Sequence, residues 1–162
     1  MKKIIVLVLF LISTMCISCS GQNNNAEDDK AKIQQVIENH DITMIFIWAE
    51  YCQASKNMFE KNIKPYLDGL AKNNAGIVII YYGKEEAVAD FKKDNILVIN
   101  KNQHSPLLIK RNANKMMKSL LKGYKKHNGM PIPLLVDKDG FVKNYNEKDK
   151  GYGYWEIFQA AK

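Results

Sequence analysis

The chain has 162 residues, of which 46% are hydrophobic and 25% charged, a composition typical of one globular domain with a substantial core. Its 24 Lys and Arg residues against 17 Asp and Glu residues give a formal net charge of +7. The basic residues are dispersed among acids and amides and lack the interleaved aromatic residues of a nucleic-acid groove. No nucleic-acid partner is therefore predicted.

The first residues of the chain predict export. Lys2 and Lys3 precede an entirely apolar run over residues 4–12, which is followed by Ser13, Thr14 and small residues around Cys19. This is the pattern of a secretory signal peptide, and the run is too short for a membrane span, which needs roughly 20 apolar residues. We therefore expect residues 1–18 to be a signal peptide.

The end of this segment resembles a bacterial lipoprotein signal. Residues 17–19 read Ile-Ser-Cys, and the resemblance implies that Cys19 becomes the lipidated first residue of the mature chain. Ordinary cleavage near Ser18 or Ser20 is the alternative, because Cys16 stands where leucine is usual. The lipidated form would be anchored in a bacterial cell envelope and face the periplasm.

The polar segment over residues 19–30 is free of large apolar side chains. Such a segment cannot bury enough surface to fold, so it is predicted to be a flexible tether that precedes a domain over residues 31–162.

Within that domain, hydrophobic periodicity and β-rich runs predict alternating helices and strands. Helices are expected over residues 31–37, 53–72, 85–93, 112–127 and 154–161. Strands are expected over residues 43–48, 76–82, 96–99, 134–136 and 141–142, the last two as an antiparallel hairpin. Pro65 should kink or split the long helix that contains it. This order predicts an α/β protein with a mixed sheet and helices on both faces.

Residues 48–56 read Trp-Ala-Glu-Tyr-Cys-Gln-Ala-Ser-Lys and resemble the thioredoxin active site Trp-Ala-x-x-Cys-x-x-Cys-Lys, with Ser55 in place of the second cysteine. The resemblance implies a thioredoxin-like three-layer fold in which Cys52 opens a helix and attacks disulfides. Trp48 and Tyr51 would shape the surface around the sulfur. Phe46 stands where thioredoxin has a buried acid, so that proton relay is absent.

A second segment is similar to the same family. Residues 129–140 read Gly-Met-Pro-Ile-Pro-Leu-Leu-Val-Asp-Lys-Asp-Gly, like the family's cis-proline, buried strand and Asp-x-x-Gly turn. The resemblance implies that Pro131 is the cis-proline, with Pro133 as the less favoured choice, and that Met130 lies beside Cys52 and pairs with the substrate. Alternatively, the two prolines merely start an edge strand.

The expected chemistry follows from a single sulfur. The unpaired N–H groups at a helix N-terminus favour the thiolate of Cys52, and Ser55 could donate its hydroxyl to the sulfur. Because serine cannot resolve a mixed disulfide, release must come from the substrate's own thiol or from an external thiol. This suits isomerisation, glutathione-type exchange or capture of client thiols.

We therefore predict thiol–disulfide exchange on exported proteins that carry thiols or disulfides. The alternative is a redox-inactive thioredoxin-fold module, tethered to the membrane, that binds a protein partner. Neither reading requires a cofactor. No metal site is predicted, because His40, His104 and His127 are far apart in the sequence and lack paired ligand spacing.

Overall fold

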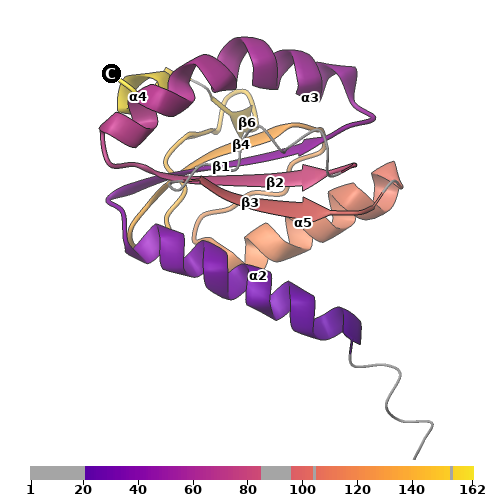
Figure 1. Ribbon diagram of the computed structural model, residues 1–162. Helices are drawn as coiled ribbons and strands as arrows, with labels where there is room; N and C mark the ends of the chain where they lie inside the picture. Colours follow the sequence, from indigo (N-terminus) through magenta and orange to yellow (C-terminus); the bar gives the residue numbers. More distant parts are fainter. Residues whose placement is uncertain (1–20, 85–95, 104, 154) are drawn as a thin grey trace, which may run out of the picture.

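A computed structural model describes residues 21–84, 96–103, 105–153 and 155–162. A four-stranded mixed sheet separates two layers of helices (Figure 1). The expected signal peptide, Cys19 and the expected helix over residues 85–93 lie outside the described residues. No helix in the described ranges is long and apolar enough to cross a membrane.

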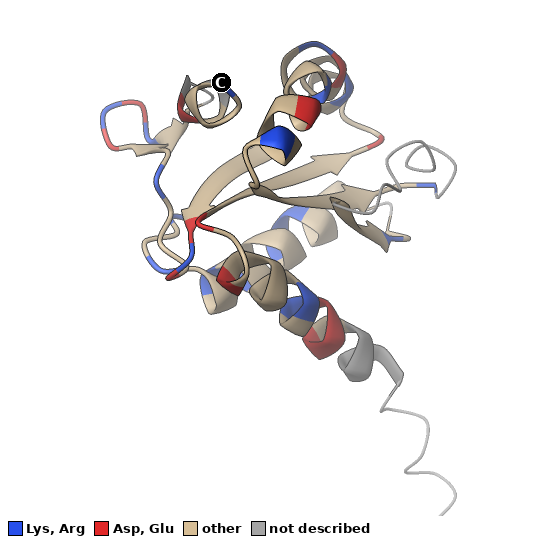
Figure 2. Ribbon diagram, turned by 60° about the vertical axis from the view of Figure 1, so that its left-hand side comes forward, with Lys and Arg blue, Asp and Glu red and all other residues tan. Residues whose placement is uncertain are grey.

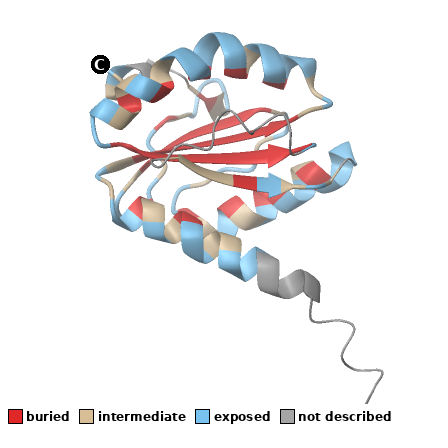
Figure 3. Ribbon diagram, in the orientation of Figure 1, coloured by how far each residue is buried: buried red, intermediate tan, exposed pale blue. Residues whose placement is uncertain are grey.

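The sheet contains four of the expected strands, in the order β3-β2-β1-β4. These are β1 (Ile42–Ala49), β2 (Gly76–Tyr82), β3 (Ile96–Lys101) and β4 (Ile132–Asp137). Strands β1, β2 and β3 are parallel, and β4 runs antiparallel to β1. Figure 3 shows that β1 and β2 are buried along nearly their whole length. Helices on both faces explain why these two strands are apolar at consecutive positions.

One face of the sheet is covered by α2 (Gly21–Glu38) and α5 (Pro106–Leu120). Alternate residues of the strands point to this face, because side chains alternate along a strand. They pack against helical residues of the same buried cluster, namely Ile33, Ile37, Ile109, Ala113 and Met117. These contacts bury the apolar stripes of both helices.

The opposite face is covered by the segment that follows β1 and by α6 (Trp155–Ala160). That segment is divided into α3 (Gln53–Met58), a π-helical turn over Phe59–Ile63, a 3-10 turn over Lys64–Tyr66 and α4 (Leu67–Lys72). The expected break at Pro65 is confirmed, since the proline lies in the 3-10 turn. Phe59, Ile63, Leu67 and Leu70 pack here on Met44, Phe46 and Trp48 of β1.

The structure differs from the expected flexible tether, because α2 already begins at Gly21. Ion pairs one helical turn apart join Lys30 to Glu27 at 2.7 Å and Lys32 to Asp28 at 2.6 Å. Asp29 also pairs with Lys101 at the end of β3. Charged contacts thus order a segment that has no large apolar side chains. A tethering role for the residues before the domain stays a prediction.

The bounds expected for the helix over residues 112–127 are wrong. Helix α5 begins at Pro106, since proline suits the first helical turn, and it ends where Leu121 adopts an extended conformation (φ −115°, ψ 134°). Gly123 then has φ 73°. The loop that follows is held by buried Asn114, whose amide accepts hydrogen bonds from the Tyr124 hydroxyl at 2.8 Å and the His127 N–H at 2.9 Å.

The expected hairpin after β4 is only partly present. The turn over residues 137–140 forms, with the Gly140 N–H donating to the Asp137 carbonyl at 2.9 Å. The return segment makes isolated bridges rather than a strand, one antiparallel between Val136 and Val142 and one parallel between Lys122 and Phe141. Next come β5 (Tyr145–Asn146) and β6 (Gly151–Tyr152), which pair with each other in a separate small sheet.

Candidate active site

Cys52 lies at the junction between β1 and α3. Its N–H donates to the Ala49 carbonyl at 3.1 Å, and its own carbonyl accepts from the Lys56 N–H at 3.2 Å. Cys52 is the N-cap residue of α3, with an extended backbone (φ −98°, ψ 104°). Its thiol is free and half-buried. The predicted placement of a cysteine at the start of a helix is therefore confirmed.

The peptide bond between Met130 and Pro131 is cis. This confirms Pro131 rather than Pro133 as the cis-proline. The Cys52 thiol donates to the Met130 carbonyl with a distance of 3.6 Å from sulfur to oxygen. The two residues are 78 positions apart in the sequence, so only the fold brings them together. The expectation that Met130 lies beside Cys52 is confirmed, and its contact with a substrate stays a prediction.

Ser55 does not make the expected hydrogen bond to the sulfur. The residue is completely buried, and its hydroxyl has no hydrogen-bond partner within the described ranges. The reason is its place in the first turn of α3, where it is the one buried residue of that helix, whereas the thiol is engaged with Met130. A tuning role for Ser55 through direct contact is therefore not supported.

Trp48 and Tyr51 have different surroundings. Trp48 is only 5% exposed and lies between the rings of Phe59, at a centroid distance of 5.0 Å, and Tyr81, at 4.5 Å. It belongs to the core beneath the Cys52 loop. Tyr51 is 47% exposed, and burial together with the nearby negative charge of a Cys52 thiolate raises the pKa of Tyr51. Tyr51 is thus the aromatic residue available to a bound molecule.

Phe46, at the position where thioredoxin has a buried acid, makes an apolar contact with Phe59. Phe46 is fully buried, and its ring lies 5.5 Å from that of Phe59. Neither side chain can take up or release a proton. Among the residues placed in the structure, the sulfur has only the Met130 carbonyl as a polar side-chain or backbone partner.

Glu50 ties the Cys52 loop to the end of β2, a role that the sequence analysis missed. Its N–H donates to the Tyr82 carbonyl at 2.9 Å, and its carboxylate accepts from the Lys84 N–H at 3.0 Å. The Lys84 N–H lowers the pKa of Glu50 against the effect of burial, helped by the Tyr81 hydroxyl. A glycine at position 83, directly after a buried strand, was the only sequence signal of this close approach.

Asn144 is a second residue that sequence reasoning missed. It is 1% exposed, and its amide accepts from the Leu135 N–H at 2.9 Å and donates to the Pro133 carbonyl at 3.0 Å. Its side chain therefore replaces a neighbouring strand along the outer edge of β4. This cover ends at Pro133, just beyond the cis peptide bond that faces Cys52.

These features together define the fold. The strand order β3-β2-β1-β4, the cysteine at the start of the helix after β1, and the cis-proline before β4 make this a thioredoxin-like three-layer α/β structure. Its site contains one cysteine where thioredoxin has two. No protein-family model matches the sequence, and no curated protein matches it either.

Several solved structures are similar to this one. A thiol:disulfide interchange protein from Bacteroides sp. has a TM-score of 0.45 at 16% identity, covering 78% of this chain and 76% of its own. The thioredoxin domain of a thiol-disulfide oxidoreductase from Bacteroides vulgatus has a TM-score of 0.47 at 15% identity, covering 79% and 84%. A thioredoxin from Wuchereria bancrofti has a TM-score of 0.45 at 16% identity, covering 78% and 83%.

Proposed function

We propose that this protein catalyses thiol–disulfide exchange through Cys52. One observation carries the proposal: a free, half-buried thiol lies 3.6 Å from the carbonyl that precedes a cis-proline. A thiol in this position is accessible to a substrate sulfur, and the adjacent backbone of Met130 is available to orient the substrate chain. The thiolate is the reactive form in such an exchange.

In the first step, the Cys52 thiolate attacks one sulfur of a substrate disulfide. A new sulfur–sulfur bond forms to Cys52, the substrate bond breaks, and the other substrate sulfur leaves as a thiolate. In the second step, a thiolate of the same substrate or of an external thiol attacks the mixed disulfide and releases Cys52. The exchange as a whole needs no net oxidant, which suits isomerisation or glutathione-type exchange.

The uncovered part of the β4 edge would bind the substrate. Asn144 and the residues after the turn satisfy this edge from Pro133 to Asp137. Within the described residues, the preceding backbone at Met130 has no such cover, and its carbonyl lies against the sulfur. An extended substrate segment could add to the edge there, as peptides do in β-augmentation, and the exposed ring of Tyr51, next to Cys52 in the chain, would be available to pack on it.

The exchange can be tested with oxidised glutathione. Wild-type protein should form a glutathione adduct at Cys52, detectable by mass spectrometry, and release one reduced glutathione for each adduct formed. Cys52→Ala should form none, and Ser55→Ala serves as a matched control that keeps the sulfur. Failure of the wild-type protein to form the adduct, with its fold intact by circular dichroism, would contradict the proposal.

A redox-inactive binding module is the second candidate. It is favoured by the lack of any hydrogen bond between Ser55 and the sulfur and by the apolar surroundings of Phe46. In that case, partners recovered from envelope extracts would be the same for wild-type protein and Cys52→Ala, with or without reductant. Thiol exchange instead predicts that recovery is lost in Cys52→Ala and reversed by dithiothreitol.

We also propose that the chain is exported and lipidated at Cys19, with residues 1–18 removed. The proposal rests on the sequence pattern of the first residues. A labelled fatty acid fed to the producing bacterium should be incorporated into wild-type protein and not into Cys19→Ala. Unchanged labelling of the variant would exclude this anchor, and cleavage near Ser18 or Ser20 would then be read from the mature N-terminus.

A further inference from the structure

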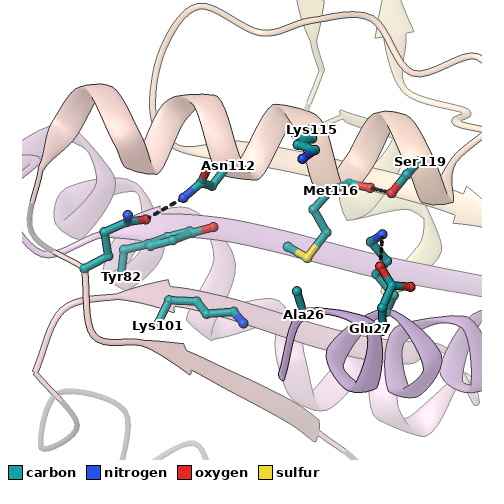
Figure 4. A pocket seen from close by; sticks show the side chains of 10 residues that line it. Ala26, Glu27, Tyr82, Lys101, Asn112, Lys115, Met116 and Ser119 are labelled. Carbon is teal, nitrogen blue, oxygen red and sulfur yellow. Dashed lines mark hydrogen bonds and ion pairs between the residues drawn. The ribbon is translucent and has the colours of Figure 1, made fainter. Parts of the chain in front are cut away.

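A cavity of about 570 Å³ lies between α2 and α5, above the carboxyl ends of β2 and β3. Its walls include Ala26 of α2, Tyr82 of β2, Lys101 of β3, and Lys115 and Met116 of α5 (Figure 4). Cys52 is not part of its lining. The volume falls within the range of sites that hold small organic molecules, and the carboxyl ends of parallel strands are where α/β sheets commonly bind ligands.

Tyr82 supplies the most specific feature of this cavity. The residue is only 3% exposed, yet its hydroxyl points into the cavity (Figure 4). No hydrogen bond links this hydroxyl to another residue that the structure describes. Burial, and then the negative charge of Asp29, raise the pKa of Tyr82, so its hydroxyl stays protonated at neutral pH. Because the hydroxyl lines the cavity, it is available to donate a hydrogen bond to a bound group.

The charged residues around the cavity leave one positive charge unbalanced. Lys30 is paired with Glu27 at 2.7 Å, and Lys101 is paired with Asp29. Lys115 makes no ion pair within the described parts of the chain. Figure 2 shows both signs of charge along α2, whereas α5 contains Lys and Arg but neither Asp nor Glu. An anionic group near Lys115 would therefore meet no carboxylate from α5.

The other side chains that line the cavity are apolar or already hydrogen-bonded. The Met116 side chain lies across the middle of the cavity (Figure 4), and Ala26 faces it from α2. At one end, the Asn112 amide donates to the Gln103 side-chain oxygen at 3.1 Å. An occupant must consequently present apolar surface to Met116, an acceptor to Tyr82 and negative charge to Lys115.

We propose that this cavity binds a small molecule with an apolar body and a single anionic group. The cavity does not include Cys52, so this proposal can be tested independently of thiol exchange. Binding orders the ligand by one charge contact and one hydrogen bond, while contact with Met116 supplies the apolar part of the affinity.

The test uses the full chain and two fluorescent probes that share one aromatic body. Anilinonaphthalene sulfonate carries the anionic group, and N-phenylnaphthylamine lacks it. Lys115→Met should weaken binding of the anionic probe about tenfold, and Tyr82→Phe about fivefold. Lys118→Met is the matched control, because Lys118 lies exposed on the same helix outside the cavity, and it should change the affinity less than about twofold.

Two further readouts locate the probe. Lys115→Met should leave the affinity of the neutral probe unchanged, and the anionic probe should shift the NMR signal of the Met116 methyl group, assigned with Met116→Leu. Equal effects of Lys115→Met and Lys118→Met would overturn the proposal. So would saturable binding that leaves the Met116 methyl signal in place, or the absence of saturable binding to the wild-type chain.

Discussion

Gly83 lies so close to Glu50 that a Cβ atom added to the glycine would come within 2.7 Å of the Glu50 Cβ. The same added atom would also overlap the Tyr81 hydroxyl. Both contacts arise because the loop with Cys52 folds over the end of β2, where Glu50 binds Tyr82 and Lys84. The absence of a side chain at position 83 therefore helps to position the Cys52 sulfur.

Gly83→Ala should lower the free energy of unfolding by about 1–3 kcal/mol, because the overlap forces the Glu50 loop or Tyr81 to move. It should also slow the reaction of Cys52 with oxidised glutathione. Urea unfolding and adduct formation measure the two effects. Gly129→Ala is the control, since its added Cβ would meet only the His127 Nε2 atom at an ordinary 3.6 Å. Equal stability losses in the two variants would contradict this explanation.

Ser55→Cys should convert the site from one thiol to two. Position 55 lies in the first turn of α3, three residues after Cys52, so the introduced thiol can attack a mixed disulfide at Cys52. We expect glutathione to be released and both thiols to resist alkylation after oxidation, which mass spectrometry measures. Ser119→Cys, on the distant helix α5, should leave Cys52 reactive. Persistent glutathione adducts in Ser55→Cys would show that the two sulfurs cannot meet.

Asn144→Ala should lower the free energy of unfolding by about 3 kcal/mol, because it leaves buried backbone groups of β4 without partners. The side chain makes three hydrogen bonds, to Leu135, Pro133 and Gly153. Asn146→Ala removes an exposed amide whose partners lie in its own turn, and should cost less than about 1 kcal/mol. Chemical denaturation compares the two, and similar costs would argue against an edge-covering role for Asn144.

Stability should fall as the solution becomes more acidic than the ordinary His pKa of 6.5. Burial, and then the charge of Lys110, lower the pKa of His127 in the folded protein. The unfolded chain therefore binds more protons below that value, and the stabilising contribution present above it is lost as the pH falls through the folded pKa. Urea midpoints at about pH 7.5 and about pH 5.5 should differ less in His127→Gln than in the wild-type protein. An equal difference in both proteins would exclude His127 as the cause.

Local signals along the chain were sufficient for much of the fold. Continuous apolar runs predicted β1 and β2, because buried central strands need apolar residues at every position. Pro65 predicted the division of the helix after β1, because proline cannot donate a helical hydrogen bond. The spacing of Pro131 before the turn at residues 137–140 indicated the cis-proline, through its resemblance to a known motif.

Other features depend on contacts between distant segments, and local patterns could not predict them. Helix α2 extends to Gly21 partly because Asp29 meets Lys101, and α5 ends early because Asn114 holds the following loop. Apolar periodicity continues through that loop, since Tyr124 is half-buried without being helical. Periodicity reports burial, and burial alone does not define where a helix stops.

By itself, the sequence determined the class of fold, the cysteine that opens the helix after β1 and the replacement of the usual second thiol by serine, because these follow from local residue patterns. Only the tertiary structure decided which atoms meet. In the folded protein the Cys52 sulfur contacts the Met130 carbonyl, and the Ser55 hydroxyl does not bind that sulfur. The Tyr82 hydroxyl points into a cavity between two helices. The physical reason is that hydrogen bonds and cavities depend on the packing of elements far apart in the chain, to within a fraction of an ångström.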